Sequence, residues 1–250
     1  MVRSLMALAL VAGVGTLAAC GGAGTGSDTA SAPAAPVAGK APPAGKSWTE
    51  TVSATADGGY VMGNPDAPVK LIEYGSRACP VCARFDAEGF SALKAGPIAA
   101  GKLSYEFREY PVHGALDIAP ILLGQCVGTE AFFPMLDEMF KAQPQLLAKA
   151  NEVIQAISTQ QLTPNQTAIQ FAEQLGYLDF VKQRGVPEAQ ARACLADPAK
   201  IDTIAKRFDA ANKAFNIAGT PTFLINGKVV ENTTDWAALK PRLAAAGAGV

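Results

Sequence analysis

Alternating and uninterrupted apolar stretches predict strands on either side of a helix in the first half of the chain. The sequence VSATADGGYVMGNPDAP starts with alternating apolar and polar residues and breaks at two turns, and the apolar run Val69–Tyr74 follows it. This pattern is typical of two short strands and then a buried one. Next, Phe85, Phe90 and Leu93 recur at near-helical spacing, and KLSYEFREYPV alternates again. This order predicts a parallel pair of strands joined by a crossover helix.

The second half of the chain has mostly helical periodicity. From residue 115 to about residue 215 the apolar patterns fit helices, so we expect an all-helical insertion there. The stretch GTPTFLINGKVVE then predicts a strand, an Asn226-Gly227 hairpin turn and a second strand, and TTDWAALKPRLAAAG predicts a closing helix. Together these segments predict an α/β fold with one helical insertion.

The amino-terminal segment has the pattern of an export signal. One positive charge precedes an apolar run that ends in LAAC, which resembles a bacterial lipobox with Cys20 as the lipidated residue. A plain signal peptide cut after Ala18 is the alternative. We expect a lipoprotein signal over residues 1–20, a flexible tether over 21–47 that is rich in Gly, Ala, Ser, Thr and Pro, and a folded domain over 48–250. Gly21 after the lipid site favours the outer membrane over the inner one by resemblance to Gram-negative lipoproteins.

Composition limits the classes of function. The chain has 250 residues, 49% of them hydrophobic, and a formal net charge of -1. A core of ordinary size can therefore form, and no basic footprint for nucleic acid is present.

The five cysteines separate into three groups. With Cys20 assigned to lipid, Cys79 and Cys82 most simply pair with each other, which leaves Cys126 with Cys194. The second pair would close a long loop and stabilise the fold by about 4 kcal/mol, less any strain. We expect it to be a structural disulfide, with a second electron relay as the alternative.

The motif CPVC lies where the buried strand gives way to the helix. A helix N-terminus favours a thiolate, so Cys79 is the candidate nucleophile, and Cys82 follows one turn later, where it can resolve a mixed disulfide. An inert disulfide and half of a zinc site are the competing interpretations. His113 is the single histidine, so a closed zinc site would need Cys126 or Cys194 as a further ligand.

Two stretches, KLIEYGSRACPVCARF and GTPTFLINGK, resemble the DsbA-like thioredoxin-fold family of envelope thiol:disulfide oxidoreductases. The resemblance covers residues 50–246 and implies a thioredoxin fold with a central mixed sheet flanked by helices. It implies that Cys79 is the exposed nucleophile and Cys82 the buried resolving thiol. It also implies that Thr220 and Pro221 form the cis-proline loop that binds an extended substrate.

The same resemblance gives Glu73 the role of a buried acid that carries a proton to or from the resolving cysteine. A surface carboxylate at a strand edge is the alternative for this residue. Strongly oxidising relatives have a histidine where this chain has Val81, so the redox potential stays open. The absence of an amino-terminal dimerisation domain favours a monomer.

We therefore expect a protein-disulfide oxidoreductase in the bacterial envelope, without cofactor or metal. Its partners would be extended cysteine-containing polypeptides and a membrane redox protein. The direction, oxidase or reductase, is open. Two alternatives are an envelope copper or zinc chaperone that uses Cys79 and Cys82 as ligands, and a tethered interaction module with a redox-inactive cysteine pair.

Overall fold

The computed structural model describes residues 35–250. The signal segment 1–20, the lipid site Cys20 and the first part of the expected tether lie outside the described residues. Residues 35–46 form no helix or strand and contact the domain: the Val37 amide donates to the Gly247 carbonyl at 3.0 Å, and the Lys40 carbonyl accepts from the Trp48 indole at 2.6 Å.

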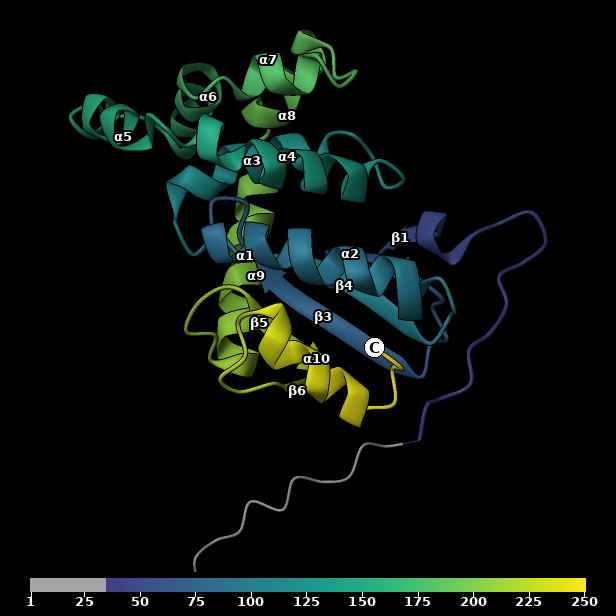
Figure 1. Cartoon of the computed structure of the whole chain (residues 1–250). Helices are drawn as coiled ribbons and strands as arrows, with labels where there is room; N and C mark the ends of the chain where they lie inside the picture. The colour runs from purple at the N-terminus through teal and green to yellow at the C-terminus, as the bar shows by residue number, and fades with distance from the viewer. Residues whose placement is uncertain (1–34) are drawn as a thin grey trace, which may run out of the picture. The chain divides into compact units, whose positions relative to one another are not determined.

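A six-stranded mixed sheet forms the centre of the domain, in the order β1-β2-β4-β3-β5-β6 (Figure 1). The only parallel pair among these strands is β3 with β4, and the connection between them contains the crossover helix that the sequence predicts. The other neighbours are antiparallel. The strands are β1 (Val52–Ala54), β2 (Tyr60–Gly63), β3 (Val69–Gly75), β4 (Leu103–Glu109), β5 (Thr222–Ile225) and β6 (Lys228–Val229).

Helices cover both faces of the sheet. On one face, a helical segment made of α1 (Pro80–Phe85), α2 (Ser91–Leu93) and the intervening and following π-helical turns packs with α10 (Trp236–Ala245). On the other face, the long helix α9 (Pro198–Phe215) packs Ala211 against Tyr74 and Leu224. Alternation along β3 explains this division, because Leu71 and Glu73 point to one face while Ile72 and Tyr74 point to the other.

The insertion is all-helical, as predicted, and has its own core. Its helices are α3 (Ala115–Gln125), α4 (Phe132–Leu146), α5 (Ala150–Ser158), α6 (Pro164–Gln174), α7 (Tyr177–Lys182) and α8 (Glu188–Ala196), and α9 leads back to the sheet. Local signals explain two helix starts: Thr163 and Gln166 form a capping box before α6, and Asp197 caps α9. A disulfide joins Cys126 to Cys194 with 6.2 Å between the Cα atoms, and so ties the end of α3 to α8.

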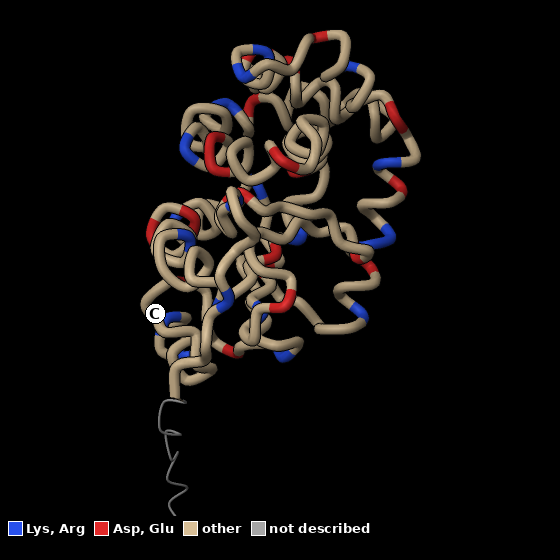
Figure 2. The backbone as a smooth tube through the Cα atoms, turned by 90° about the vertical axis from the view of Figure 1, so that its right-hand side faces the viewer, with Lys and Arg blue, Asp and Glu red and all other residues tan. Residues whose placement is uncertain are grey.

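Helix α4 connects the two cores. Met135 and Met139 pack into the core of the insertion, while Phe132, Phe133 and Phe140 pack against α1 and the sheet. Charges of both signs are interspersed along the chain (Figure 2). Within residues 35–250, no helix combines the length and the apolar character that crossing a bilayer requires.

Candidate active site

The two CPVC cysteines lie at the junction of β3 and α1, as the sequence predicts. Cys79 is the residue that caps α1, and Pro80 occupies the first turn. The Cys79 amide donates to the Ser76 carbonyl at 3.1 Å, and the Cys79 carbonyl accepts from the Ala83 amide at 3.2 Å. Both thiols are free among the described residues. Cys79 is only 5% exposed, so the expectation of an exposed nucleophile is wrong, whereas Cys82 is fully buried as expected.

The environment of Cys79 favours its thiolate. A hydrogen bond from the Cys82 thiol is the largest of the effects that lower the pKa of Cys79 to about 5, and burial opposes it. The Thr220 side chain and the backbone amides of Cys82 and Val81 lower this pKa further. Amides at the start of a helix stabilise an anion in this way. Cys79 can therefore act as a nucleophile at neutral pH.

The environment of Cys82 has the opposite effect. Burial is the first cause that raises its pKa well above the ordinary value of a thiol, and the hydrogen bond to Cys79 and the negative charges of Glu73 and Cys79 add to it. The two thiols thus differ strongly in acidity although only two residues separate them. Cys82 must lose its proton before it can attack a mixed disulfide.

The loop before β5 faces Cys79 from the other side. The Cys79 sulfur lies 3.3 Å from the carbonyl oxygen of Thr220, and the peptide bond between Thr220 and Pro221 is cis. The buried Thr220 hydroxyl has no hydrogen-bond partner within residues 35–250, which leaves it free to donate to the thiolate. Cys79, Thr220 and Pro221 therefore meet at one point although they are far apart in the sequence.

Glu73 lies inside the domain, on the same face of β3 as the core that holds both cysteines. Glu73 is only 1% exposed, and one of its carboxyl oxygens accepts a 2.6 Å hydrogen bond from the Tyr105 hydroxyl. The other oxygen has no partner in the described part of the chain. Burial raises the pKa of Glu73 well above its usual range; the Tyr105 hydrogen bond opposes this, and the charges of Asp86 and Cys79 add to it. Burial therefore favours the protonated form of Glu73.

Another buried carboxyl lies on the helical segment that begins at the CPVC motif. Asp86 borders a cavity of about 380 Å³ that Asp137 and Lys141 of α4 also line. Burial, and then the charge of Asp137, raise the pKa of Asp86 to about 7, while Lys141 and Lys94 lower it. The sequence analysis did not single out Asp86, although its place one turn after Cys82 is a usable signal.

Polar side chains of the insertion fix the backbone of the cysteine loop. The Asp117 carboxylate accepts from the Ser76 hydroxyl at 2.7 Å and from the Ala78 amide at 3.1 Å. The Gln143 side chain donates to the carbonyls of Arg77 and Cys79 at 2.9 and 3.1 Å. Sequence reasoning missed these contacts. The signal for Asp117 was a lone acid within the apolar stretch LDIAPILLG.

Arg77 and Glu109 form a buried ion pair beside this loop. The guanidinium donates to one Glu109 oxygen at 2.7 and 2.9 Å, and the two side chains are 0% and 5% exposed. Arg77 also donates to the Met139 sulfur at 3.1 Å and lies over the Phe132 ring. The pair holds the end of β4 and the loop against the insertion.

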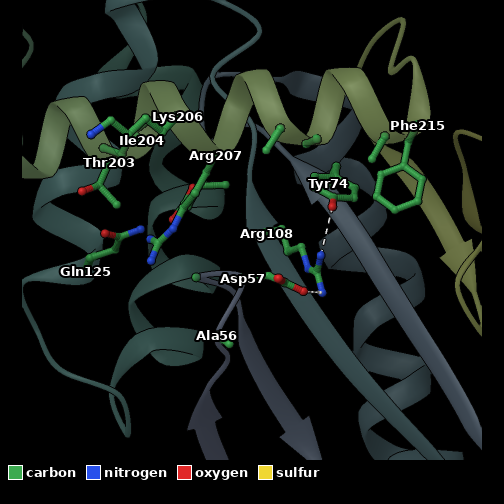
Figure 3. Close-up of a pocket in the computed structure, with 15 residues that line it drawn as sticks. Ala56, Asp57, Tyr74, Arg108, Gln125, Thr203, Ile204, Lys206, Arg207 and Phe215 are labelled. Atoms are coloured by element: carbon green, nitrogen blue, oxygen red, sulfur yellow. Dashed lines mark hydrogen bonds and ion pairs between the residues drawn. The ribbon is translucent and has the colours of Figure 1, made fainter.

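A separate cavity of about 510 Å³ lies between α9, the ends of β3 and β4 and the β1–β2 turn (Figure 3). Near its wall, Arg108 pairs with Asp57 at 2.8 Å and donates to the Tyr74 hydroxyl at 3.0 Å. Neither CPVC cysteine lines this cavity. This cavity is therefore distinct from the cysteine site.

The predicted site residues fall into two places. Cys79, Cys82, Glu73, Thr220 and Pro221 belong to one cluster at the end of the sheet, whereas the Cys126–Cys194 disulfide lies in the insertion. No group of three or more His, Cys, Asp or Glu side chains within residues 35–250 is arranged to hold a metal ion.

Comparison with known proteins identifies the family. A family model described as thioredoxin matches residues 55–244. A crystal structure of a protein-disulfide isomerase from Novosphingobium aromaticivorans is 30% identical, with a TM-score of 0.72 over 76% of this chain and 98% of that chain. Wolbachia pipientis alpha-DsbA1 shares the fold, with a TM-score of 0.54 at 20% identity over 75% of this chain and 91% of that chain.

Among curated sequences, a candidate protein-disulfide oxidoreductase of Rickettsia bellii is 26% identical over 69% of this chain. The match covers 58% of that relative, so the chain spans little more than half of its length. The chain belongs to the thioredoxin family, in the DsbA-like form of the fold with a helical insertion.

Proposed function

We propose that this chain is a thiol:disulfide oxidoreductase that exchanges disulfides with extended cysteine-containing polypeptides in the bacterial cell envelope. One observation carries the proposal: an acidic Cys79 at a helix N-terminus lies 3.3 Å from the Thr220 carbonyl, with the far less acidic Cys82 buried behind it. The family relatives named as protein-disulfide oxidoreductases support it.

In the reducing direction, the Cys79 thiolate attacks one sulfur of a substrate disulfide. A bond forms between Cys79 and that sulfur, and the second substrate sulfur leaves as a thiolate. Cys82, after giving up its proton, then attacks the Cys79 sulfur, which forms the Cys79–Cys82 disulfide and releases the second product thiolate. The substrate gains two electrons and the enzyme loses two. The oxidising direction is the reverse of these steps.

Glu73 is proposed as the group that takes and returns the Cys82 proton. Its raised pKa favours the protonated form, which can supply a proton to the Cys82 thiolate, and the same carboxyl in its ionised form can take the proton from the Cys82 thiol. Thr220 and Pro221 are proposed to hold the substrate backbone beside Cys79, because the loop presents its polar groups at the nucleophile.

Export, lipidation at Cys20, an outer-membrane location, a monomeric state and a membrane redox partner belong to this proposal through the sequence patterns described above. Labelling with a radioactive fatty acid tests the lipid: the label should be lost in Cys20→Ala and retained in the wild type. Retention of the label by Cys20→Ala would contradict this part of the proposal.

The central experiment is the capture of mixed disulfides in the living cell with Cys82→Ser. Without the resolving thiol, covalent complexes with substrate proteins should accumulate and dissolve on reduction. Cys79→Ser should capture none, and the matched control Cys126→Ser, Cys194→Ser, with Cys82 intact, should resemble the wild type. Absence of covalent complexes in the Cys82→Ser variant would refute thiol exchange as the function.

A further inference from the structure

A histidine outside the CPVC motif is tied to the cysteine loop. The His113 Nδ1 atom lies 2.9 Å from the Ser76 hydroxyl and 3.4 Å from the Asp117 carboxylate. The Ser76 hydroxyl in turn lies 3.2 Å from the Ala78 amide, and the Ser76 carbonyl accepts from the amide of Cys79. The ring is therefore connected to the nucleophile's own backbone through one serine.

The hydrogen-bond directions fix which ring nitrogen carries hydrogen. Ser76 has one hydroxyl hydrogen, and it is donated to the Asp117 carboxylate at 2.7 Å. Nδ1 of His113 must therefore donate to the serine oxygen rather than accept from it. Nε2 is left to gain or lose the proton that sets the charge of the ring.

The charged groups near this ring are few. Asp117, from the same loop-to-α3 segment, raises the pKa of His113 through a hydrogen bond and its charge; burial opposes this, and the Cys79 charge raises the pKa further. The other neighbours line a cavity of about 350 Å³ and carry no charge: Ala115, Leu116, Ile154, Ile157, Ser158, Thr167 and Phe171. The ring is 38% exposed, so protons of the solvent reach it.

We propose that His113 is a positioning residue that, when protonated, stabilises the Cys79 thiolate from outside the CPVC motif, and that oxidation of the cysteine pair releases a proton from it. The inference rests on the proposed function only in assuming that the pair cycles between dithiol and disulfide. Electrostatic coupling between two sites is reciprocal, so a thiolate that holds a proton on the histidine is itself stabilised by that proton.

The redox balance follows from this coupling. In the reduced protein the thiolate and the imidazolium attract each other. When the Cys79 and Cys82 sulfurs form a disulfide, two electrons pass to the disulfide that is being reduced, the Cys82 proton is released, the negative charge on Cys79 disappears and the affinity of His113 for its proton falls. At a pH where the ring is partly protonated, reduction therefore takes up part of a proton at His113, and the Cys79–Cys82 pair is more oxidising than it would be with an uncharged ring.

The chain offers a clean probe for this inference, because it contains one histidine. Nuclear magnetic resonance titration of the imidazole should give a higher pKa in the reduced protein than in the oxidised protein. In Cys79→Ser, the titration should not change with redox state. Identical titrations of the wild type in both redox states would overturn the proposal.

A second measurement uses the reduced protein alone, so it stands even if the protein exchanges no disulfides with polypeptides. In His113→Gln, alkylation of Cys79 at about pH 5, close to the pKa of this thiol, should slow about twofold because less thiolate is present. At pH 8, where the thiolate predominates in both proteins, the rates should agree. His113→Lys should retain the wild-type rate at the lower pH, which separates the effect of charge from that of packing. Equal rates for the glutamine variant and the wild type at pH 5 would overturn the proposal.

Discussion

The two cysteine pairs of this chain have opposite surroundings. Cys79 and Cys82 are free thiols at a helix N-terminus, between a carbonyl of the cis-proline loop and a buried acid. Cys126 and Cys194 form a disulfide between two helices of the insertion, with Lys200 as the charged neighbour of Cys194 at 3.7 Å. Two pairs of the same residue type therefore lie in different environments, one as free thiols and one as a disulfide.

The contrast shows that proximity alone does not make a cysteine pair reactive. The CPVC pair combines two features: amides and a second thiol that lower the pKa of one sulfur, and a buried acid beside the other. The insertion pair has no comparable set of groups around it in the contacts described, and its 68-residue separation favours a stabilising role. We expect mutation to separate these roles.

The largest expected effect is loss of exchange in Cys79→Ser. Removal of the nucleophile should abolish reduction of a protein disulfide such as that of insulin, because within residues 35–250 no other free thiol lies against the Thr220 carbonyl. The double variant Cys126→Ser, Cys194→Ser should retain the wild-type rate. Comparable activity losses in the two variants would end the distinction between the pairs.

Next in size is the stability of the insertion. The Cys126→Ser, Cys194→Ser variant should lose about 4 kcal/mol in free energy of unfolding, less any strain in the native disulfide, because its unfolded chain is no longer cross-linked. Chemical denaturation of oxidised wild type and variant measures the difference. An unchanged denaturation midpoint would show that the disulfide does not contribute to stability.

A smaller effect is expected at the buried acid. Glu73→Gln keeps the shape and the Tyr105 contact but removes the exchangeable proton, so attack by Cys82 should slow about 100-fold. Stopped-flow measurement of mixed-disulfide resolution tests this at neutral pH. The pKa of Cys79 should stay close to that of the wild type while the resolution rate falls. A shifted Cys79 pKa with an unchanged resolution rate would assign Glu73 an electrostatic role only.

The last expected effect is a pH-dependent stability of the reduced protein. The pKa of Cys79 is lower in the folded state than the ordinary thiol value of 9.0, so its thiolate stabilises the fold at alkaline pH, and this contribution is lost as the pH falls through about 5. The stability of reduced wild type relative to reduced Cys79→Ser should therefore rise between these two pH values. A constant difference across that range would contradict the thiolate assignment.

Local sequence patterns predicted the α/β layout, the helical insertion and the place of the CPVC motif, and the family resemblance added the thioredoxin fold and the roles of Glu73, Thr220 and Pro221. Strand alternation, the CPVC at a strand-to-helix junction and the Thr-Pro before the final hairpin each depend on neighbouring residues. Asp117, Gln143 and the Arg77–Glu109 pair could not be found in this way, because their function depends on contacts across folded elements. The place of Asp86 one turn after Cys82 is visible in the sequence, but its burial and the contact with Asp137 of α4 that raise its pKa are visible only in the fold.

The packing of Arg77 has a consequence for how this domain can be engineered. A side chain at Gly124 of α3 would collide with the guanidinium, so α3 lies directly against the residue two positions before Cys79. Deletion of the insertion would leave the Arg77–Glu109 pair without its apolar cover and the cysteine loop without the Asp117 and Gln143 contacts. A minimal version of this protein therefore has to keep α3 and α4, because these two helices pack directly against the loop that carries Cys79.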